Sequence, residues 1–384
     1  MSKIDREALY SLWLLLNAGQ CTPKTYKALR LFGSFETIFE ASPSDFPREF
    51  FSPAERNAFA DKKLDSAVEL LMYCKDRQIS MIHYNHPEYP QMLRQIHRPP
   101  LVLFVRGKLP DFSRPSVAVI GSRSCSETGR KFAARLAYEI SLRGGIVVSG
   151  VADGIDQYAQ KGAIYARSPN VAVLPCGVDL LYSESCRDLY AYTLNGGALV
   201  SEYLPRTPAR KTHFDARNRI ISGLSRAVVV VEAGQKSGAF LTVNHAIEQN
   251  KPVFAVPGFP GSPYSEGTNL LIEEGAMVCT GAQSVLDSLD SDLRQLLIPL
   301  KTAKQQRKQQ KSVRSEAPAA EEKPLSDSER ELCAFLGESP ISVDELCEKT
   351  AKPFGEILSR LRSLELADVV ESVYGGYYKI KKKS

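Results

Sequence analysis

The spacing of apolar positions changes along the chain and divides it into parts of different structure. In residues 1–77, apolar side chains such as Leu9, Leu12 and Leu16 recur every three or four positions. This spacing is typical of amphipathic helices and predicts a small helical domain, with one long helix over 53–77.

Residues 84–290 show short, continuous apolar runs that alternate with amphipathic stretches. The predicted strands are 117–120, 146–149, 171–174, 198–201, 227–231, 253–256 and 277–279. The predicted helices between them are 127–143, 154–167, 185–195, 217–223, 239–250 and 267–275. Strands that are apolar on both faces predict an α/β fold with a doubly wound, mostly parallel, Rossmann-like sheet.

The C-terminal part again has a different composition. Residues 301–324 are polar and basic, which predicts a disordered linker. In residues 325–384, three short amphipathic stretches precede a β-hairpin with Gly375 and Gly376 at its turn. Three helices followed by a hairpin predict a winged-helix domain.

Composition excludes several classes of protein. Forty-nine Lys and Arg against 44 Asp and Glu give a net charge of +5, too small for bulk polycationic binding of nucleic acid. We expect no membrane association, because no apolar run approaches the length of a transmembrane helix. Eight scattered Cys without a Cys-x-x-Cys pair indicate reduced thiols in a cytoplasmic protein. His83 and His86 are three residues apart, but no matching third ligand follows, so we expect no metal site and no cofactor.

Glycine-rich segments follow several of the predicted strands. Gly121-Ser122-Arg123 and Ser237-Gly238 stand where the carboxyl ends of parallel strands meet, which is where doubly wound folds bind ligands. Glycine lets the backbone approach an anion, and arginine suits phosphate. The sequence has neither the Gly-x-Gly-x-x-Gly fingerprint of dinucleotide-binding proteins nor the Walker A motif of P-loop NTPases. It therefore predicts a phosphate-binding site that belongs to neither of these two classes of protein.

The segment 206–226 holds six basic residues and one acid. Lys211, Phe214, Arg217, Asn218 and Arg219 combine cations for phosphates with an aromatic ring for a base, which is typical of proteins that bind single strands without sequence preference. A solvated, charged connection is the alternative interpretation, but the Pro, Phe and Asn between the charges, at the carboxyl end of a predicted strand, favour nucleic-acid binding.

Two further hypotheses remain open. Asp156 or Glu232, beside the glycine loops, could act as a general base in a Rossmann-like nucleoside-phosphate hydrolase. The winged helix could bind duplex DNA as a transcription factor, although its third helix offers only a weak basic face.

At these segments the chain resembles the DprA/Smf family of DNA-processing proteins. The resemblance runs from about Tyr89 to Ala276 and is strongest at Gly121-Ser122-Arg123, at Arg217-Asn218-Arg219-Ile220-Ile221 and at Ser237-Gly238. The N-terminal part resembles the family's helical domain, of the SAM or helix-hairpin-helix kind, and the winged helix resembles its accessory domain.

The resemblance implies a non-enzymatic protein that binds single-stranded DNA in natural transformation, protects it, helps load RecA on it for homologous recombination, and forms a homodimer through the Rossmann-like domain. Together with the residue patterns, it gives a predicted nucleic-acid site of Gly121, Ser122, Arg123, Lys211, Phe214, Arg217, Asn218, Arg219, Ser237 and Gly238. Asp153 and Gln160 depart from the family pattern, which has a basic residue and a histidine there.

Overall fold

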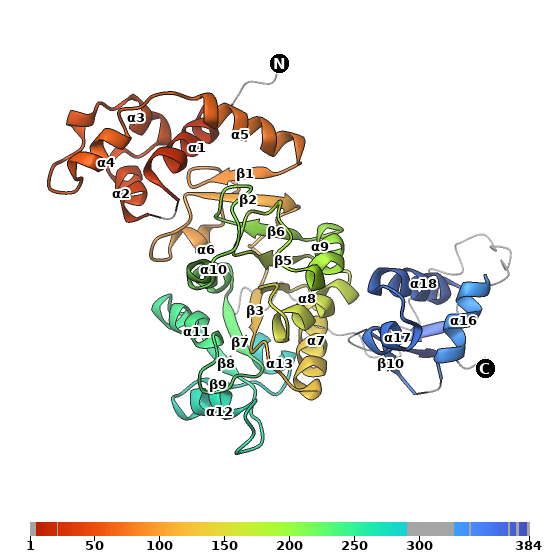
Figure 1. Cartoon of the computed structure of the whole chain (residues 1–384). Coiled ribbons are helices and arrows are strands. Elements are labelled where there is room, and N and C mark those ends of the chain that lie inside the picture. The colour runs from red at the N-terminus through yellow and green to blue at the C-terminus, as the bar shows by residue number, and fades with distance from the viewer. Residues whose placement is uncertain are drawn as a thin grey trace.

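The computed structural model describes residues 5–20, 22–289, 326–337, 339–367, 369–373 and 376–381. Figure 1 shows the helical segment, the sheet with its helices, and a separate C-terminal unit. The predicted linker at 301–324 lies outside the described residues.

Helices from the first 76 residues pack around an aromatic core. They are α1 (Arg6–Ala18), α2 (Pro23–Phe32), α3 (Phe35–Glu40), α4 (Pro53–Ala58) and α5 (Asp65–Asp76), with a 3-10 turn at Pro43–Asp45. The prediction of one helix over 53–77 was wrong, because the segment between α4 and α5 is not helical and is held by tertiary contacts. Phe59 stacks on Phe46 at 4.4 Å, and the carbonyl of Asp61 accepts a 2.7 Å hydrogen bond from the indole of Trp13.

The central sheet has nine strands in the order β1-β2-β6-β5-β4-β3-β7-β8-β9. They are β1 (Ser80–His83), β2 (Val102–Gly107), β3 (Ser116–Ile120), β4 (Ile146–Ser149), β5 (Asn170–Val173), β6 (Ala198–Ser201), β7 (Ala227–Val230), β8 (Val253–Ala255) and β9 (Met277–Val278). In this order, all neighbouring strands from β6 across to β9 pair in parallel. The pairs β1–β2 and β2–β6 are antiparallel. The sheet therefore begins before residue 84, where the sequence pattern placed the start of the α/β part.

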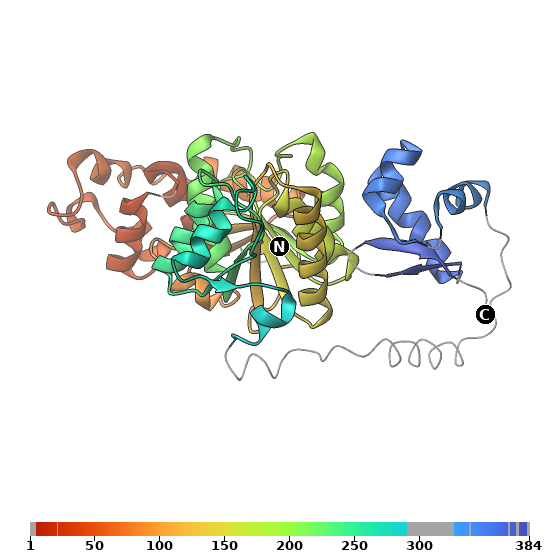
Figure 2. The same ribbon diagram turned by 90° about the horizontal axis from the view of Figure 1, so that it is seen from below.

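Helices cover both faces of the sheet (Figure 2). One face packs against α6 (Gln91–Arg94), α10 (Lys211–Gly223), α11 (Ala239–Glu248) and α12 (Glu266–Glu273). The other packs against α7 (Glu127–Leu142), α8 (Ile155–Tyr165) and α13 (Ala282–Leu286). A 3-10 turn (Glu184–Cys186) leads into α9 (Arg187–Leu194), which contacts α8. The predicted doubly wound α/β fold is thus confirmed.

Helix α10 begins six residues earlier than the predicted start at 217. Arg210 is extended at the helix N-cap, and the ring of His213 in the first turn stacks on Tyr203 at 4.0 Å. A His213 ring nitrogen also lies 3.0 Å from the carbonyl oxygen of Pro175. These contacts fix the start of the helix, so Lys211 and Phe214 lie on α10 and not in a loop.

The C-terminal unit has the predicted winged-helix architecture. Its elements are α16 (Asp327–Phe335), β10 (Ile341–Ser342), α17 (Val343–Thr350), α18 (Phe354–Leu366), β11 (Val370–Ser372) and β12 (Tyr377–Ile380), and the strand order is β10-β12-β11. Ser326 and Ser342 begin α16 and α17 with capping boxes, in which serine and the glutamate three positions on satisfy each other's backbone N–H. Leu346, Ile357 and Leu361 fill the core between the helices.

No helix in the described residues is both long and apolar enough to cross a membrane.

Candidate nucleic-acid interface

The candidate site lies where the strand order reverses, between β3 and β7. The loop after β3 is held from both sides: the backbone N–H of Ser122 donates to the carbonyl of Glu232 at 2.8 Å, and that of Ile155 donates to the carbonyl of Ser122 at 3.3 Å. Gly154 has φ of +90°, and a Cβ there would collide with the backbone of Ser122 and Arg123. The three loops thus pack closely at the position where doubly wound sheets bind ligands.

Phe214 is the centre of a cluster formed by side chains from two loops and α10. The guanidinium carbon of Arg123 lies 5.0 Å from the centre of its ring, and that of Arg217 lies 5.8 Å from it. Tyr182 meets the ring in an edge arrangement at 5.7 Å and 71°. Phe214 is half-buried and Arg123 is exposed, so an aromatic plane and a cation both face the solvent side of the sheet.

Lys211 opens α10, three residues before Phe214, and its side chain is exposed. The N-terminus of a helix carries partial positive charge and free backbone N–H groups. Lys211 therefore adds a mobile cation to a helix end that already favours an anion, beside the Phe214 ring.

A buried carboxylate and a buried guanidinium support this cluster from below. Asp156 is 7% exposed, and burial raises its pKa to about 6, against the opposing effects of Arg217 and of the backbone N–H groups of Gly121 and Gly150. Arg217 is 4% exposed; it donates to the carbonyl of Val173 at 2.6 Å and to the Asn218 side chain at 3.1 Å. Arg217 and Asn218 thus brace the site from inside the fold.

A hollow lies on the side of the β3 loop that faces away from the Phe214 cluster. It has a volume of ≈ 390 Å³ and is lined by Ser122, Ser124, Gly234, Lys236, Ser237, Pro263 and Tyr264. The Ser237 hydroxyl accepts a bond from Ala239 N–H at 3.3 Å, and exposed Gly238 caps α11. Hydroxyls, a lysine and a helix start give this hollow the chemistry of an anion site.

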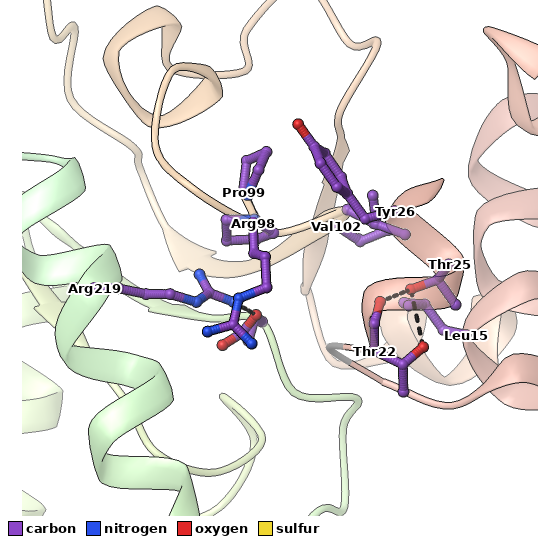
Figure 3. Close-up of a pocket in the computed structure, with 11 residues that line it drawn as sticks. Leu15, Thr22, Thr25, Tyr26, Arg98, Pro99, Val102 and Arg219 are labelled. Carbon is purple, nitrogen blue, oxygen red and sulfur yellow. Dashed lines mark hydrogen bonds and ion pairs between the residues drawn. The ribbon is translucent and has the colours of Figure 1, made fainter. Parts of the chain in front are cut away.

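Arg219 lies elsewhere. Figure 3 shows it in a small pocket of ≈ 20 Å³ between α10 and the N-terminal helices, with Arg98, Thr22 and Thr25 nearby. Its guanidinium forms a buried ion pair with Glu202. The structure therefore brings together nine of the ten predicted residues around the β3 loop and places Arg219 at the junction with the helical domain.

Glu232, one of the two candidate bases, is occupied by structural bonds. Its carboxylate accepts from the backbone N–H of Ser126 at 2.7 Å and from the Ser126 hydroxyl at 2.6 Å, which secures the start of α7. The two departures from the family pattern also make internal bonds. Asp153 accepts from the Ser185 hydroxyl at 2.8 Å, and Gln160 donates to the carbonyl of Val171 at 2.8 Å.

Within the described residues, no three His, Cys, Asp or Glu side chains gather in a way that could hold a metal ion. The rings of His83 and His86 lie 5.4 Å apart, and His83 lies beside Asp5 near α1.

The sequence prediction omitted three side chains that the fold brings to the site: Tyr182, Lys236 and Tyr264. Tyr182 follows Cys176-Gly177 and Lys236 precedes Ser237 in segments that the pattern marked as loops at strand ends. Tyr182 and Lys236 could have been suggested from the sequence, because both segments follow the carboxyl ends of predicted strands. Tyr264 comes from the loop after β8, and only the folding of that loop over Gly234 brings it near.

The family model of DNA recombination-mediator protein A matches residues 80–290, which include the whole sheet and the site. The chain belongs to the DprA/Smf family. A second family model, the DprA winged helix domain, matches residues 316–376. The resemblance drawn from the glycine loops and the Arg-Asn-Arg-Ile-Ile segment is thereby confirmed.

Individual DprA/Smf proteins match over much of the chain. Protein Smf of Escherichia coli is 33% identical over 331 residues, 85% of this chain and 83% of its own length. DNA processing protein DprA of Streptococcus pneumoniae is 39% identical over 198 residues, 52% of this chain and 70% of its own length.

Two solved structures share the fold. The X-ray structure of Streptococcus pneumoniae DprA has a TM-score of 0.61 at 30% identity and covers 73% of this chain and 98% of its own. A Helicobacter pylori DprA structure, described for its single-stranded DNA binding mode, has a TM-score of 0.50 at 29% identity and covers 56% of this chain and 97% of its own.

Proposed function

We propose that this DprA/Smf protein binds single-stranded DNA at the β3–β7 switch point. The observation that carries the proposal is the position of the Arg123 guanidinium over the Phe214 ring, 5.0 Å from its centre, with Lys211 one turn away on α10. A ring with cations around it holds a base by stacking and the adjacent phosphates by charge, and neither contact depends on sequence.

Each part of the site has a place in this proposal. Arg123, Lys211 and Phe214 contact the strand directly, and the backbone at Gly121, Ser122, Ser237 and Gly238 receives a further phosphate. Arg217 and Asn218 hold the cluster in shape from below, since both are buried and bonded within the protein. Arg219 acts on the site only through α10, because its side chain pairs with Glu202.

The wider role follows from family membership. The family's description as a recombination mediator supports a role in which the protein protects incoming strands in natural transformation and helps to load the RecA recombinase on them. The single-strand binding mode described for the Helicobacter pylori relative supports the choice of ligand. We place this activity in the cytoplasm.

We also propose that the protein acts as a homodimer through the β9 side of the sheet. Among the described residues β9 is the edge strand on this side of the sheet, and both Met277 and Val278 are exposed there. Leu270 on α12 and Ile247 on α11 add exposed apolar surface beside it. Exposed apolar side chains gathered at a sheet edge indicate a protein contact.

The proposed function involves no covalent step. Of the two candidate bases, Glu232 is used by Ser126, which supports a binding role. Asp156 supports the alternative of a nucleoside-phosphate hydrolase, because a carboxyl with a pKa of about 6 beside a phosphate-binding loop is suited to general base catalysis. Release of free base from nucleoside monophosphates, abolished by Asp156→Asn, would favour that alternative.

Fluorescence anisotropy with labelled oligo-dT and a duplex of the same length tests the proposal. We expect tighter binding of the single strand and an affinity that falls as salt rises. Equal affinity for both forms at every salt concentration would contradict it. RecA filament formation on the same oligo-dT, with and without this protein, tests the mediator role separately.

A further inference from the structure

The winged helix rests against the flank of the sheet formed by α7, α8 and α9. Tyr165, the last residue of α8, is partly buried and packs against the hydrophobic core of the winged helix. The ring of Phe354, which opens α18, lies 6.0 Å from the ring of Tyr165 and 5.6 Å from that of Tyr192 on α9. Three aromatic rings from separate parts of the chain thus form one contact.

Two glycines allow the close approach. A Cβ at Gly376, in the wing, would overlap the Tyr165 ring, and a Cβ at Gly355 would overlap the Tyr192 hydroxyl. Gly376 also has φ of +84°, which disfavours any other residue. Both glycines therefore allow a close approach to the flank that a side chain would prevent.

Charges on the two sides are complementary. Lys161 of α8 pairs with Asp344 of α17, and it also lies 5.1 Å over the Phe354 ring. Arg167 pairs with Glu365 at 3.6 Å, and Lys131 of α7 lies 5.8 Å over the ring of Tyr377. Residues 325–384 hold eleven Asp and Glu against nine Lys and Arg, so a mildly acidic unit meets three cations of the flank.

The start of α18 and the wing, which contact the flank here, are the parts that a winged helix-turn-helix protein presents to DNA. In those proteins the start of the recognition helix enters the major groove. Here α18 begins with Phe354 and Gly355 against the flank. Lys352, just before α18, and Arg360, on α18, pair with Glu331 and Glu356 within the winged helix.

We propose that the winged helix is a protein-docking module that binds the α7–α8–α9 flank of its own chain through the start of α18 and the wing. Its acidic charge and its internal ion pairs suit it to this basic, aromatic surface and not to a phosphate backbone. This role is independent of the proposed single-strand site, because the contact uses the C-terminal half of α8 and the site uses the loop before that helix.

Hydrogen–deuterium exchange of the full chain, with small-angle scattering in parallel, tests the docking. In the unmodified chain we expect protection of the α8 end, of α9 and of the start of α18. Lys161→Glu places two carboxylates together, so exchange at all three segments should rise about tenfold and the radius of gyration should increase. Lys161→Glu with Asp344→Lys restores the pair with reversed sign and should restore both readouts. Lys75→Glu makes the same charge reversal at an exposed lysine of α5, outside the flank, and is the matched control that should change neither readout.

Three results would overturn the proposal. Unchanged protection in Lys161→Glu would show that the contact does not hold the winged helix. Protection that disappears on dilution would show a contact between copies. Binding of duplex DNA by the unmodified chain that is lost in Phe354→Ala would show that the start of α18 contacts DNA. Folding of each variant is checked by exchange at the core strands β3 and β4, which should stay protected, and Gly355→Val gives a second variant that should undock without a change of charge.

Discussion

The guanidinium of Arg123 lies over the ring of Phe214, 5.0 Å from its centre, although one residue follows β3 and the other lies on α10. The contact places a cation, which suits a phosphate, next to an aromatic ring, on which a base can stack, and proteins that bind single strands use both together. The site therefore separates into residues that contact ligand and residues that hold those residues in position, and substitutions should distinguish the two groups.

Removing an exposed cation should weaken binding without affecting the fold. We expect Arg123→Ala and Lys211→Ala each to lower affinity for oligo-dT and for mixed sequences alike, and to reduce the salt slope by about one, as for the loss of one phosphate contact. Anisotropy titrations at several salt concentrations measure this. Lys108→Ala is the control, because Lys108 is exposed at the opposite end of the sheet, next to Gly197 before β6. An equal loss in that variant would mean that the charge acts non-specifically.

Loss of the Phe214 ring should act differently. Phe214→Ala should cost about 1–3 kcal/mol of binding free energy for each base that stacks on the ring, with an unchanged salt slope. Phe214→Leu keeps apolar bulk but has no ring and should lose nearly as much, whereas Phe214→Tyr should retain binding. Affinity equal to the unmodified protein in Phe214→Leu would show that the ring itself is not used.

The ion pair between Arg219 and Glu202 should matter for stability. Both side chains are buried, so Arg219→Met leaves an uncompensated carboxylate and should cost about 3–5 kcal/mol of unfolding free energy. Arg219→Met with Glu202→Leu should recover most of that loss. Urea unfolding of the two variants measures the difference; a double variant no more stable than the single one would contradict the prediction.

Asp156 should make stability depend on pH. Its pKa in the folded protein is about 6, above the ordinary value of 3.8, so the folded state binds the proton more tightly than the unfolded state. The stability of the unmodified protein relative to Asp156→Asn should therefore be highest below about pH 4 and fall by about 3 kcal/mol as pH rises through 6, at 1.36 kcal/mol per pKa unit. Urea unfolding of both proteins from pH 4 to 7 checks the sign, and a relative stability that rises with pH would be the contrary result.

The β9 side of the sheet should control assembly. Met277→Glu and Leu270→Glu place charge on the exposed apolar surface and should convert dimers to monomers in sedimentation velocity. Leu31→Glu alters another exposed leucine, on α2, and should leave the dimer intact. A dimer that survives both first substitutions would place the interface elsewhere.

Much of this organisation could be predicted from local pattern. Apolar runs such as 146–149 and 227–231 fall on β4 and β7, because a strand buried on both faces needs apolar side chains throughout. Glycine, serine and arginine after β3, and the cations with Phe214, indicated a phosphate and base site, and the order of these motifs indicated the family that the comparisons confirmed.

The tertiary structure decided the rest. Arg217 and Arg219 are two positions apart, and on α10 this spacing turns one toward Phe214 and the other toward Glu202. Their different partners follow from a helix that begins at Lys211, which depends on the stacking of His213 on Tyr203 and not on local propensity. The antiparallel strands β1 and β2 and the contact of the winged helix with Tyr165 likewise join segments distant in sequence, and a pattern of neighbouring residues carries no information about such pairings.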